Sequence, residues 1–202
     1  MRRTSARRCS VAGSMLFLAA LVATAAAQMP SPPDRDAKLG AMRELDFLVG
    51  DWRGSGWMQM GPQMRIDFKS REIVERKLGG MIVAIEGIHE GVPPGSTDSV
   101  TVHHAFAVLS YDAQAKKYRF RSWLENGLAG DYEATVNAGT LEWGYEDPRR
   151  GRIRYIIRLD DKGQWQETGD FSKDGTTWMP FFAMTLSRAA PGVAAPPGAP
   201  SR

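Results

Sequence analysis

The chain has 202 residues, which is enough for one ordinary domain with its own hydrophobic core. Its formal net charge is +3, but residues 1–27 carry four arginines and no acids, so the remainder has a net charge of −1 and gives no support for nucleic-acid binding. Cys9 is the single cysteine. Residues 28–202 therefore have no disulfide framework, no thiolate nucleophile and no cysteine metal site.

Residues 1–27 follow the pattern of a secretory signal peptide. Arginines at the start precede the apolar run VAGSMLFLAALVA, and three alanines then stand before Gln28. The run is too short and too rich in alanine for a membrane span, although an uncleaved anchor is the alternative. We expect export to the periplasm or the medium, with no membrane association after cleavage.

Two polar or small-residue segments flank the expected domain. Residues 28–35 form a proline-rich linker, and residues 189–202 consist almost entirely of Ala, Pro, Gly, Ser and Arg. Neither segment can bury enough apolar surface to offset the entropy of ordering, so both are expected to be flexible. The predicted domain is 36–188.

The period of the apolar residues changes at Gly50. Before it, Leu39, Met42, Leu45 and Leu48 recur at helical spacing and predict one short helix. After it, apolar and polar residues alternate, which predicts strands with one apolar face. The predicted inward sets are Met64, Ile66 and Phe68; Met81, Val83 and Ile85; Val100, Val102, His104, Phe106 and Val108; Tyr118, Phe120, Ser122 and Leu124; Gly130, Tyr132, Ala134 and Val136; and Ile153, Tyr155, Ile157 and Leu159.

Turn sequences separate these runs at short and regular intervals, for example YDAQAKK, NAG, EDPRRG and DDKG. About ten short strands joined as hairpins indicate an up-and-down barrel or a sandwich. Alternation with one apolar face favours a barrel with an apolar interior. The fold class is therefore all-β, a roughly ten-stranded antiparallel barrel with one short N-terminal helix.

The segment ELDFLVGDWRGSGW resembles the opening motif of the lipocalin and calycin superfamily. In that superfamily a Trp after Gly-x closes one end of the barrel, and an Arg after the last strand covers it. The resemblance implies this structural role for Gly50, Trp52 and Arg188. The fuller pattern, with KLGGMIV, YDAQAKKYRF and a final Leu-Ser-Arg, is similar to a bacterial family known as a domain of unknown function.

Nitrobindin-like haem barrels are similar in the same opening motif. Their iron ligand is a histidine of the last strand, a few residues before the terminal Arg. Here that stretch reads TTWMPFFAMTLSR, with Phe181 or Phe182 near the ligand position. The departure from the family pattern predicts that haem is not bound by that route, and no other cofactor is indicated.

The expected interior offers contacts for a small ligand. The candidates share an inward position and are His104, Phe106, Ser122, Tyr132, Trp143 and Tyr155. His104 is placed inside as a ligand contact, a single metal ligand, a general base or a satisfied core histidine. His103 is expected to point outward, and His89 to lie at the mouth. Because neighbouring His103 and His104 diverge on a strand, they cannot chelate one metal, and no metal site is predicted.

The charged residues give weaker indications. Asp131 and Glu133 are expected on the outer face, while Glu167 is expected inside without a partner acid. Basic residues on two strands, Arg119 and Arg121 with Arg152, Arg154 and Arg158, are interpreted as a solvated outer face. No hydrolase, zincin, P-loop or dinucleotide motif is present in the sequence.

Three functions remain compatible with this pattern. The favoured one is an exported, non-enzymatic barrel that binds a small hydrophobic or amphipathic ligand. The second is an envelope enzyme that uses His104, and Glu167 with it, as base on a buried substrate. The third is a filled structural barrel with an interaction surface on its outer face. Fold alone does not choose among them.

Overall fold

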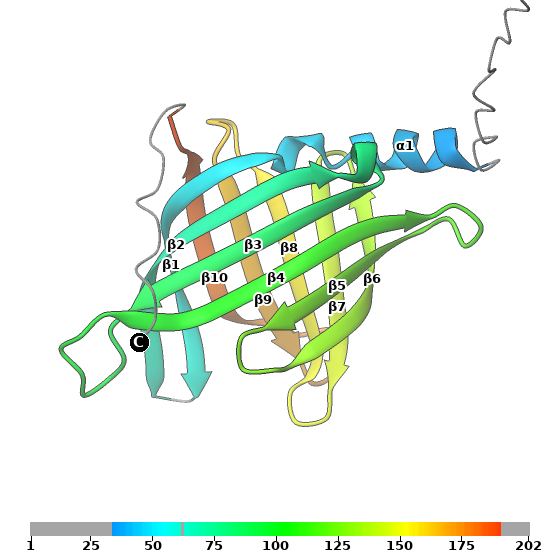
Figure 1. The fold of residues 1–202 in the computed structure, drawn as a ribbon. Coiled ribbons are helices and arrows are strands. Elements are labelled where there is room, and N and C mark those ends of the chain that lie inside the picture. The colour runs from blue at the N-terminus through cyan, green and yellow to red at the C-terminus, as the bar shows by residue number, and fades with distance from the viewer. Residues whose placement is uncertain (1–33, 62, 191–202) are drawn as a thin grey trace, which may run out of the picture. The chain divides into compact units, whose positions relative to one another are not determined.

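The computed structural model describes residues 34–61 and 63–190. Ten antiparallel strands form a closed barrel in the order β1-β10-β9-β8-β7-β6-β5-β4-β3-β2, so each strand pairs with its sequence neighbours and β1 pairs with β10 (Figure 1). The predicted ten-stranded up-and-down barrel with one short helix is confirmed. The predicted signal peptide, most of the linker and most of the C-terminal tail lie outside the described residues.

The elements have the following bounds: α1 (Arg35–Arg43), the 3-10 turn η1 (Asp46–Leu48), β1 (Gly50–Gly61), β2 (Met64–Lys77), the 3-10 turn η2 (Leu78–Gly80), β3 (Ile82–Gly91), β4 (Val100–Asp112), β5 (Lys117–Leu124), β6 (Ala129–Asn137), β7 (Thr140–Asp147), β8 (Gly151–Leu159), β9 (Trp165–Ser172) and β10 (Met179–Arg188). Within these ranges no helix is long and apolar enough to cross a bilayer.

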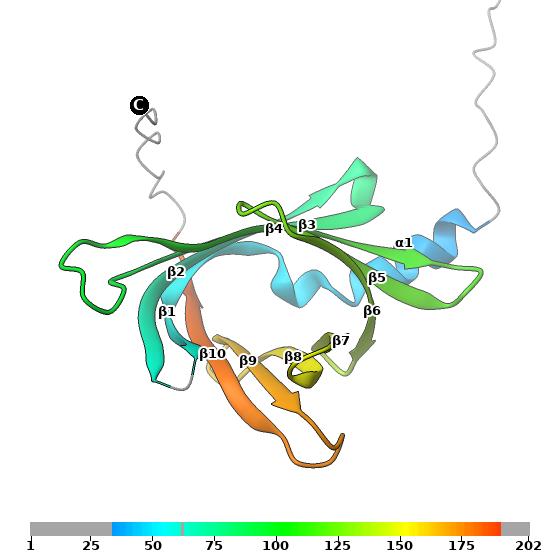
Figure 2. The ribbon, with the colours of Figure 1, turned by 90° about the horizontal axis from the view of Figure 1, so that it is seen from below.

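The N-terminal helical segment covers one end of the barrel. A view into the opposite end shows a ring of strands with this segment crossing behind it (Figure 2). Its side chains Met42, Leu45 and Leu48 are fully buried, and the Tyr118 hydroxyl of β5 donates a hydrogen bond of 2.8 Å to the carbonyl of Ala41. The observed helix is shorter than the sequence predicts. The apolar pattern continues to Leu48, but α1 ends at Arg43 and Leu48 lies in η1.

Trp52 and Arg188 meet at this closed end. The Trp52 indole is fully buried, and its Nε1 donates to the Leu48 carbonyl at 2.7 Å. The Arg188 guanidinium lies 4.1 Å from the centroid of the Trp52 ring and donates to the carbonyls of Phe47 and Val49. Gly50 has a φ of +151°, and a Cβ there would collide with the Arg188 guanidinium. The structure thus brings together the three residues that the resemblance places at the closure.

The glycines of β1 make room for neighbouring core side chains. A Cβ on Gly56 would lie 2.6 Å from both the Met184 Cβ and the Phe68 Cζ, closer than real Cβ contacts. Gly54 is similarly crowded by Leu186 of β10. Gly54 and Gly56 lie on the same inner face of β1 as Trp52, so the Gly-rich opening of the strand reflects close packing inside the barrel.

The predicted inward face of β4 is wrong for His104 and Phe106. The β3–β4 pairing shifts register between His89 and Glu90, a β-bulge at the start of β4. Beyond the bulge, Ala107 and Leu109 are buried while Phe106 is 43% exposed. One extra residue in a strand reverses which side chains face the interior, and an alternation read continuously from Val100 cannot detect it.

Candidate functional site

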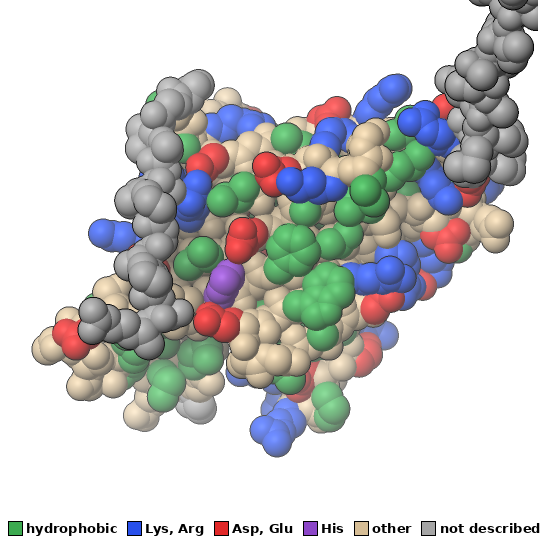
Figure 3. Space-filling view, in the orientation of Figure 1, with side chains coloured by type: hydrophobic (Ala, Val, Ile, Leu, Met, Phe, Trp, Pro, Cys, Tyr) green, Lys and Arg blue, Asp and Glu red, His purple; other side chains and the backbone are tan. Residues whose placement is uncertain are grey.

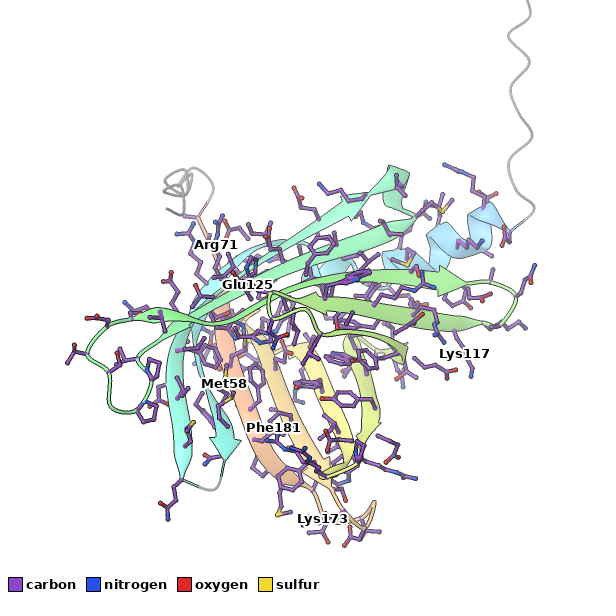
Figure 4. The ribbon with its side chains drawn as sticks, turned by 60° about the horizontal axis from the view of Figure 1, so that its bottom comes forward. Met58, Arg71, Lys117, Glu125, Lys173 and Phe181 are labelled. Atoms are coloured by element: carbon purple, nitrogen blue, oxygen red, sulfur yellow. The ribbon has the colours of Figure 1, made fainter. Side chains whose placement is uncertain are left out.

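The barrel interior contains a cavity of about 480 Å³. Its rim includes Met60, Leu128 and Tyr145, which are all exposed and lie at strand ends opposite α1, so the cavity opens there. Met58 of β1 and Phe181 of β10 line it near the same end (Figure 4). The volume is that of a small-molecule site, and the barrel is therefore not filled by its own side chains.

Strands β5 to β8 contribute an aromatic wall, which consists of Phe120, Tyr132, Trp143 and Tyr155. The Trp143 ring is stacked between Phe120 and Tyr155, with centroid distances of 4.3 and 4.4 Å and interplanar angles of 7° and 9°. Tyr132 lies 5.2 Å from Trp143. The register explains the row, because Phe120 pairs with Tyr132 and Trp143 pairs with Tyr155 across adjacent strands.

Four of the predicted ligand contacts are thus in the cavity lining: Ser122, Tyr132, Trp143 and Tyr155. His104 and Phe106 are not, since they project from the outer wall. His104 lies 3.3 Å from Glu86 and 3.4 Å from Glu125 on the outer surface. Figure 3 shows this wall, with one histidine between acidic side chains and hydrophobic side chains gathered beside it.

Four ionisable side chains lie together elsewhere in the cavity lining, among apolar neighbours. We define the acid–imidazole cluster as Glu72 of β2, His89 of β3, His103 of β4 and Glu167 of β9, all of which line the cavity. The His89 Nε2 lies 3.0 Å from the Glu72 Oε1, and the His89 and His103 rings are 5.0 Å apart. The Trp165 Nε1 donates to Glu167 at 3.1 Å. Trp165 packs edge-on against Trp52 at 5.7 Å, so the carboxyls lie toward the closed end.

Burial shifts the pKa of every member of this cluster toward its neutral form. Burial raises the pKa of Glu72 to about 8, and burial together with the Glu72 charge raises the pKa of Glu167 to about 8. Burial lowers the pKa values of His89 and His103 to about 4. At neutral pH Glu72 and His89 are therefore both uncharged, and the tautomer of His89 decides whether Glu72 or the His89 Nε2 donates the hydrogen bond between them. The His89 Nδ1 has no hydrogen-bond partner among the described residues.

The structure corrects two histidine predictions. His103, expected outside, lines the cavity because of the β4 bulge. His89, expected at the mouth, is only 4% exposed and is stacked on Phe68 with a centroid distance of 4.4 Å. The imidazoles available to a ligand are therefore different from the one proposed from the sequence.

Glu72 escaped the sequence analysis, although a signal for it existed. The inward alternation of Ile66 and Phe68 continues through Ser70, Glu72 and Val74, all of which are buried. Extending that alternation by two inward positions, to Ser70 and then Glu72, would have placed the acid inside. Its meeting with Glu167, some 95 residues later, follows from barrel closure and has no local signal.

Other charged residues lie where the sequence predicts. Asp131 pairs on the outer wall with Arg119 at 2.7 Å and with Arg121 at 3.0 Å. Glu133 pairs with Lys117 at 2.8 Å. These exposed ion pairs contribute little to the stability of the protein. Their acids lie on the outer wall and do not belong to the cavity.

The residues do not fit a haem held from the last strand. A register shift between Pro180 and Phe182 places both Phe181 and Phe182 in the cavity lining, so β10 presents phenyl rings there. Among residues 34–61 and 63–190 no group of three or more His, Cys, Asp or Glu side chains is placed to hold a metal ion.

Comparison with known proteins supports the fold. No protein-family model matches the sequence, and no curated protein matches it. The crystal structure of Rv2717c from M. tuberculosis is similar, with a TM-score of 0.52 at 13% sequence identity over 74% of this chain and 98% of that one. A protein of unknown function from the DUF3598 family of Nostoc punctiforme aligns over 73% of this chain and 98% of its own at 9% identity, with a TM-score of 0.19. The first similarity shows a shared barrel fold, and the second is too weak to support an argument.

Proposed function

We propose that the protein is an exported barrel that binds a small hydrophobic or amphipathic ligand in its lumen. The observation that carries this proposal is the open cavity of about 480 Å³, with an aromatic wall on one side and a few polar groups on the other. Small-molecule sites have this composition, in which apolar walls supply affinity and sparse polar groups orient the ligand.

Filling the cavity with a larger side chain tests lumen binding directly. Ala105 lines the cavity, whereas neighbouring His104 faces the outside, so Ala105→Phe should fill the site and His104→Phe should not. Titration with a neutral naphthalene probe, followed by tryptophan fluorescence, measures the affinity. We expect Ala105→Phe to weaken binding by roughly tenfold or more, or about 1.4 kcal/mol, with the control unchanged.

Equal affinity of the two variants would place the probe elsewhere on the protein. Failure of wild-type protein to bind any apolar probe would reject the proposal. Native mass spectrometry of freshly prepared protein adds an independent measurement, because a carried ligand appears as additional mass.

Export is supported by the signal pattern of residues 1–27. Intact-mass analysis of the protein from fractionated cells tests it. We expect a chain that starts at Gln28 in the periplasm or the medium, and an uncleaved chain that stays in the cytoplasm would reject export.

The Glu72–His89 contact of 3.0 Å favours a second candidate function, acid–base catalysis on a lumen substrate. A buried carboxyl that holds an imidazole is the partner that a general base needs. If native mass spectrometry identifies a carried ligand, incubating it with the protein should give a product, and His89→Ala should abolish this conversion while His104→Ala should not.

A further inference from the structure

The deep part of the cavity contains two carboxyl groups without a positive partner. Among the described residues that line the cavity, Arg150 is the single Lys or Arg, and it belongs to the β7–β8 connection. Its guanidinium lies 5.6 Å from the Phe181 ring, at the open end. Glu72 and Glu167 lie instead beside Trp52 and Trp165 at the closed end. Burying such acids is unfavourable unless they stay protonated or gain a partner.

We propose that the ligand supplies the missing positive charge, and that the lumen takes a small organic cation whose ammonium group lies between Glu72, Glu167 and the aromatic wall. This inference rests on the proposed function of lumen binding. The apolar part of such a ligand packs against the edges of the Trp143 and Tyr155 rings, because the two faces of Trp143 are covered by Phe120 and Tyr155. The two carboxyls provide the charged acceptors.

The local structure holds these groups in place. A Cβ on Gly87 would lie 2.5 Å from both Glu72 carboxyl oxygens, so the glycine of β3 leaves the space that this carboxyl occupies. His89, which also lines the cavity, is 4% exposed and yet leaves its Nδ1 without a partner among the described residues. A buried polar group left incomplete beside a cavity indicates a place where a ligand completes it.

Binding of a cation changes the protonation of the site. The free carboxyls, whose pKa values are raised to about 8, hold their protons at neutral pH. A cation favours the ionised form, so a carboxyl proton leaves to solvent, and His89 can then donate from Nε2 to ionised Glu72. The other titratable groups that line the cavity are His103, Tyr132, Tyr145 and Tyr155, together with Arg150 at the open end. The lowered pKa of His103 and the raised pKa values of Tyr145 and Tyr155 keep these three neutral at pH 7. Affinity for a permanent cation should therefore rise as pH increases through about 8.

A charged probe and its neutral carbon isostere distinguish the contribution of charge to the affinity from that of shape. The cation is naphthylethyl-trimethylammonium, and in the isostere a tert-butyl group replaces the trimethylammonium. Isothermal titration calorimetry on the full chain measures both affinities from about pH 6 to about pH 9, a range that spans the carboxyl pKa values. We expect the cation to bind roughly 10- to 100-fold more tightly at about pH 9 than at about pH 6, because ionised carboxylates form ion pairs with it and protonated carboxyls do not. The affinity of the isostere should not change with pH.

Two isosteric variants test the acids directly. Glu72→Gln and Glu167→Gln should each remove most of the preference for the cation and its pH dependence, while binding of the isostere persists. The matched control is Glu86→Gln, because Glu86 is an acid of the outer wall. The pH series on wild-type protein needs no variant and gives a result even if a variant does not fold.

The outcomes separate the two proposals. If the isostere binds as tightly as the cation, or more tightly, the inferred cation preference is overturned and lumen binding stands. A preference that survives in both Gln variants also overturns it. If neither probe binds, lumen binding fails and the inference fails with it.

Discussion

The Trp52–Arg188 closure of the barrel and the cavity next to it differ in how their polar groups are satisfied. At the closed end, the Trp52 Nε1 has an acceptor and the Arg188 guanidinium has an aromatic face and two carbonyls. In the cavity, the His89 Nδ1 lacks a partner among the described residues, and burial raises the pKa values of Glu72 and Glu167 to about 8. In the first region each of these polar groups has a partner within the protein, whereas in the second a buried polar atom has none among the described residues. Stability and ligand binding should therefore respond to substitutions in different regions.

The largest expected effect is on stability, at the closed end. Trp52→Ala removes a fully buried side chain that packs on Trp165 and Leu48, so the free energy of unfolding should fall by about 3–5 kcal/mol. Urea denaturation measures the loss. The matched control is Trp57, which faces outward with its ring centroid 4.5 Å from the Arg65 guanidinium. Trp57→Ala should lower the free energy of unfolding by less than about 1 kcal/mol. Equal losses would contradict a structural role specific to the closed end.

A smaller effect is expected where β1 passes from the closed end toward the cavity. Gly56→Ala inserts a methyl group 2.6 Å from Met184 and Phe68 and should destabilise the protein by about 1–3 kcal/mol. Gly40 of α1 has no atom within 4 Å of a new Cβ, so Gly40→Ala should be neutral or stabilising by up to about 1 kcal/mol. The same urea denaturation compares the two variants. An unchanged free energy of unfolding for Gly56→Ala would show that β2 and β10 can move away from β1 without cost, and would contradict close packing at this position.

The pH dependence of stability isolates the acid–imidazole cluster. The raised carboxyl pKa values contribute stability that is complete below the ordinary Glu pKa of 4.5 and is lost as pH rises through about 8. The lowered histidine pKa values contribute stability that is present above 6.5 and is lost as pH falls through about 4. Between about pH 6.5 and 8 the carboxyls alone act, so the free energy of unfolding should decrease with rising pH by about 1–2 kcal/mol for each carboxyl.

The double variant Glu72→Gln with Glu167→Gln should flatten that decrease, because the amides do not titrate. Chemical denaturation across this pH range supplies the measurement. A decrease that is unchanged in the double variant would assign the pH dependence to other groups.

The smallest effect concerns two neighbouring histidines. His104→Ala should leave the affinity for the naphthalene probe within about twofold of wild type, because His104 contacts Glu86 and Glu125 on the outer wall. His103→Ala alters the cavity surface itself and should change the affinity by more than that. Fluorescence titration compares the two, and a larger effect of His104→Ala would reverse the assignment of the faces.

The alternation of β8 and that of β4 show what a sequence pattern can determine. In β8 the inward positions of Ile153, Tyr155 and Ile157 follow directly from the pattern, because the strand pairs without interruption. In β4 the bulge opposite His89 reverses the pattern, and the outer face carries Phe106 while the inner face carries Ala107. Hydrophobicity pointed to the wrong face there, because this barrel exposes large apolar side chains on one wall.

The sequence by itself determined the local features of this protein: the period of two, the turns that delimit ten strands, and the Gly-x-Trp segment that begins the barrel. These depend on neighbouring residues, whose spacing is written in the chain. The tertiary structure alone decided the β4 register and the meeting of Glu72, His89, His103 and Glu167 in one cavity. The physical reason is that this cluster forms only when a closed barrel brings four separate strands around one interior, and no local pattern encodes that closure.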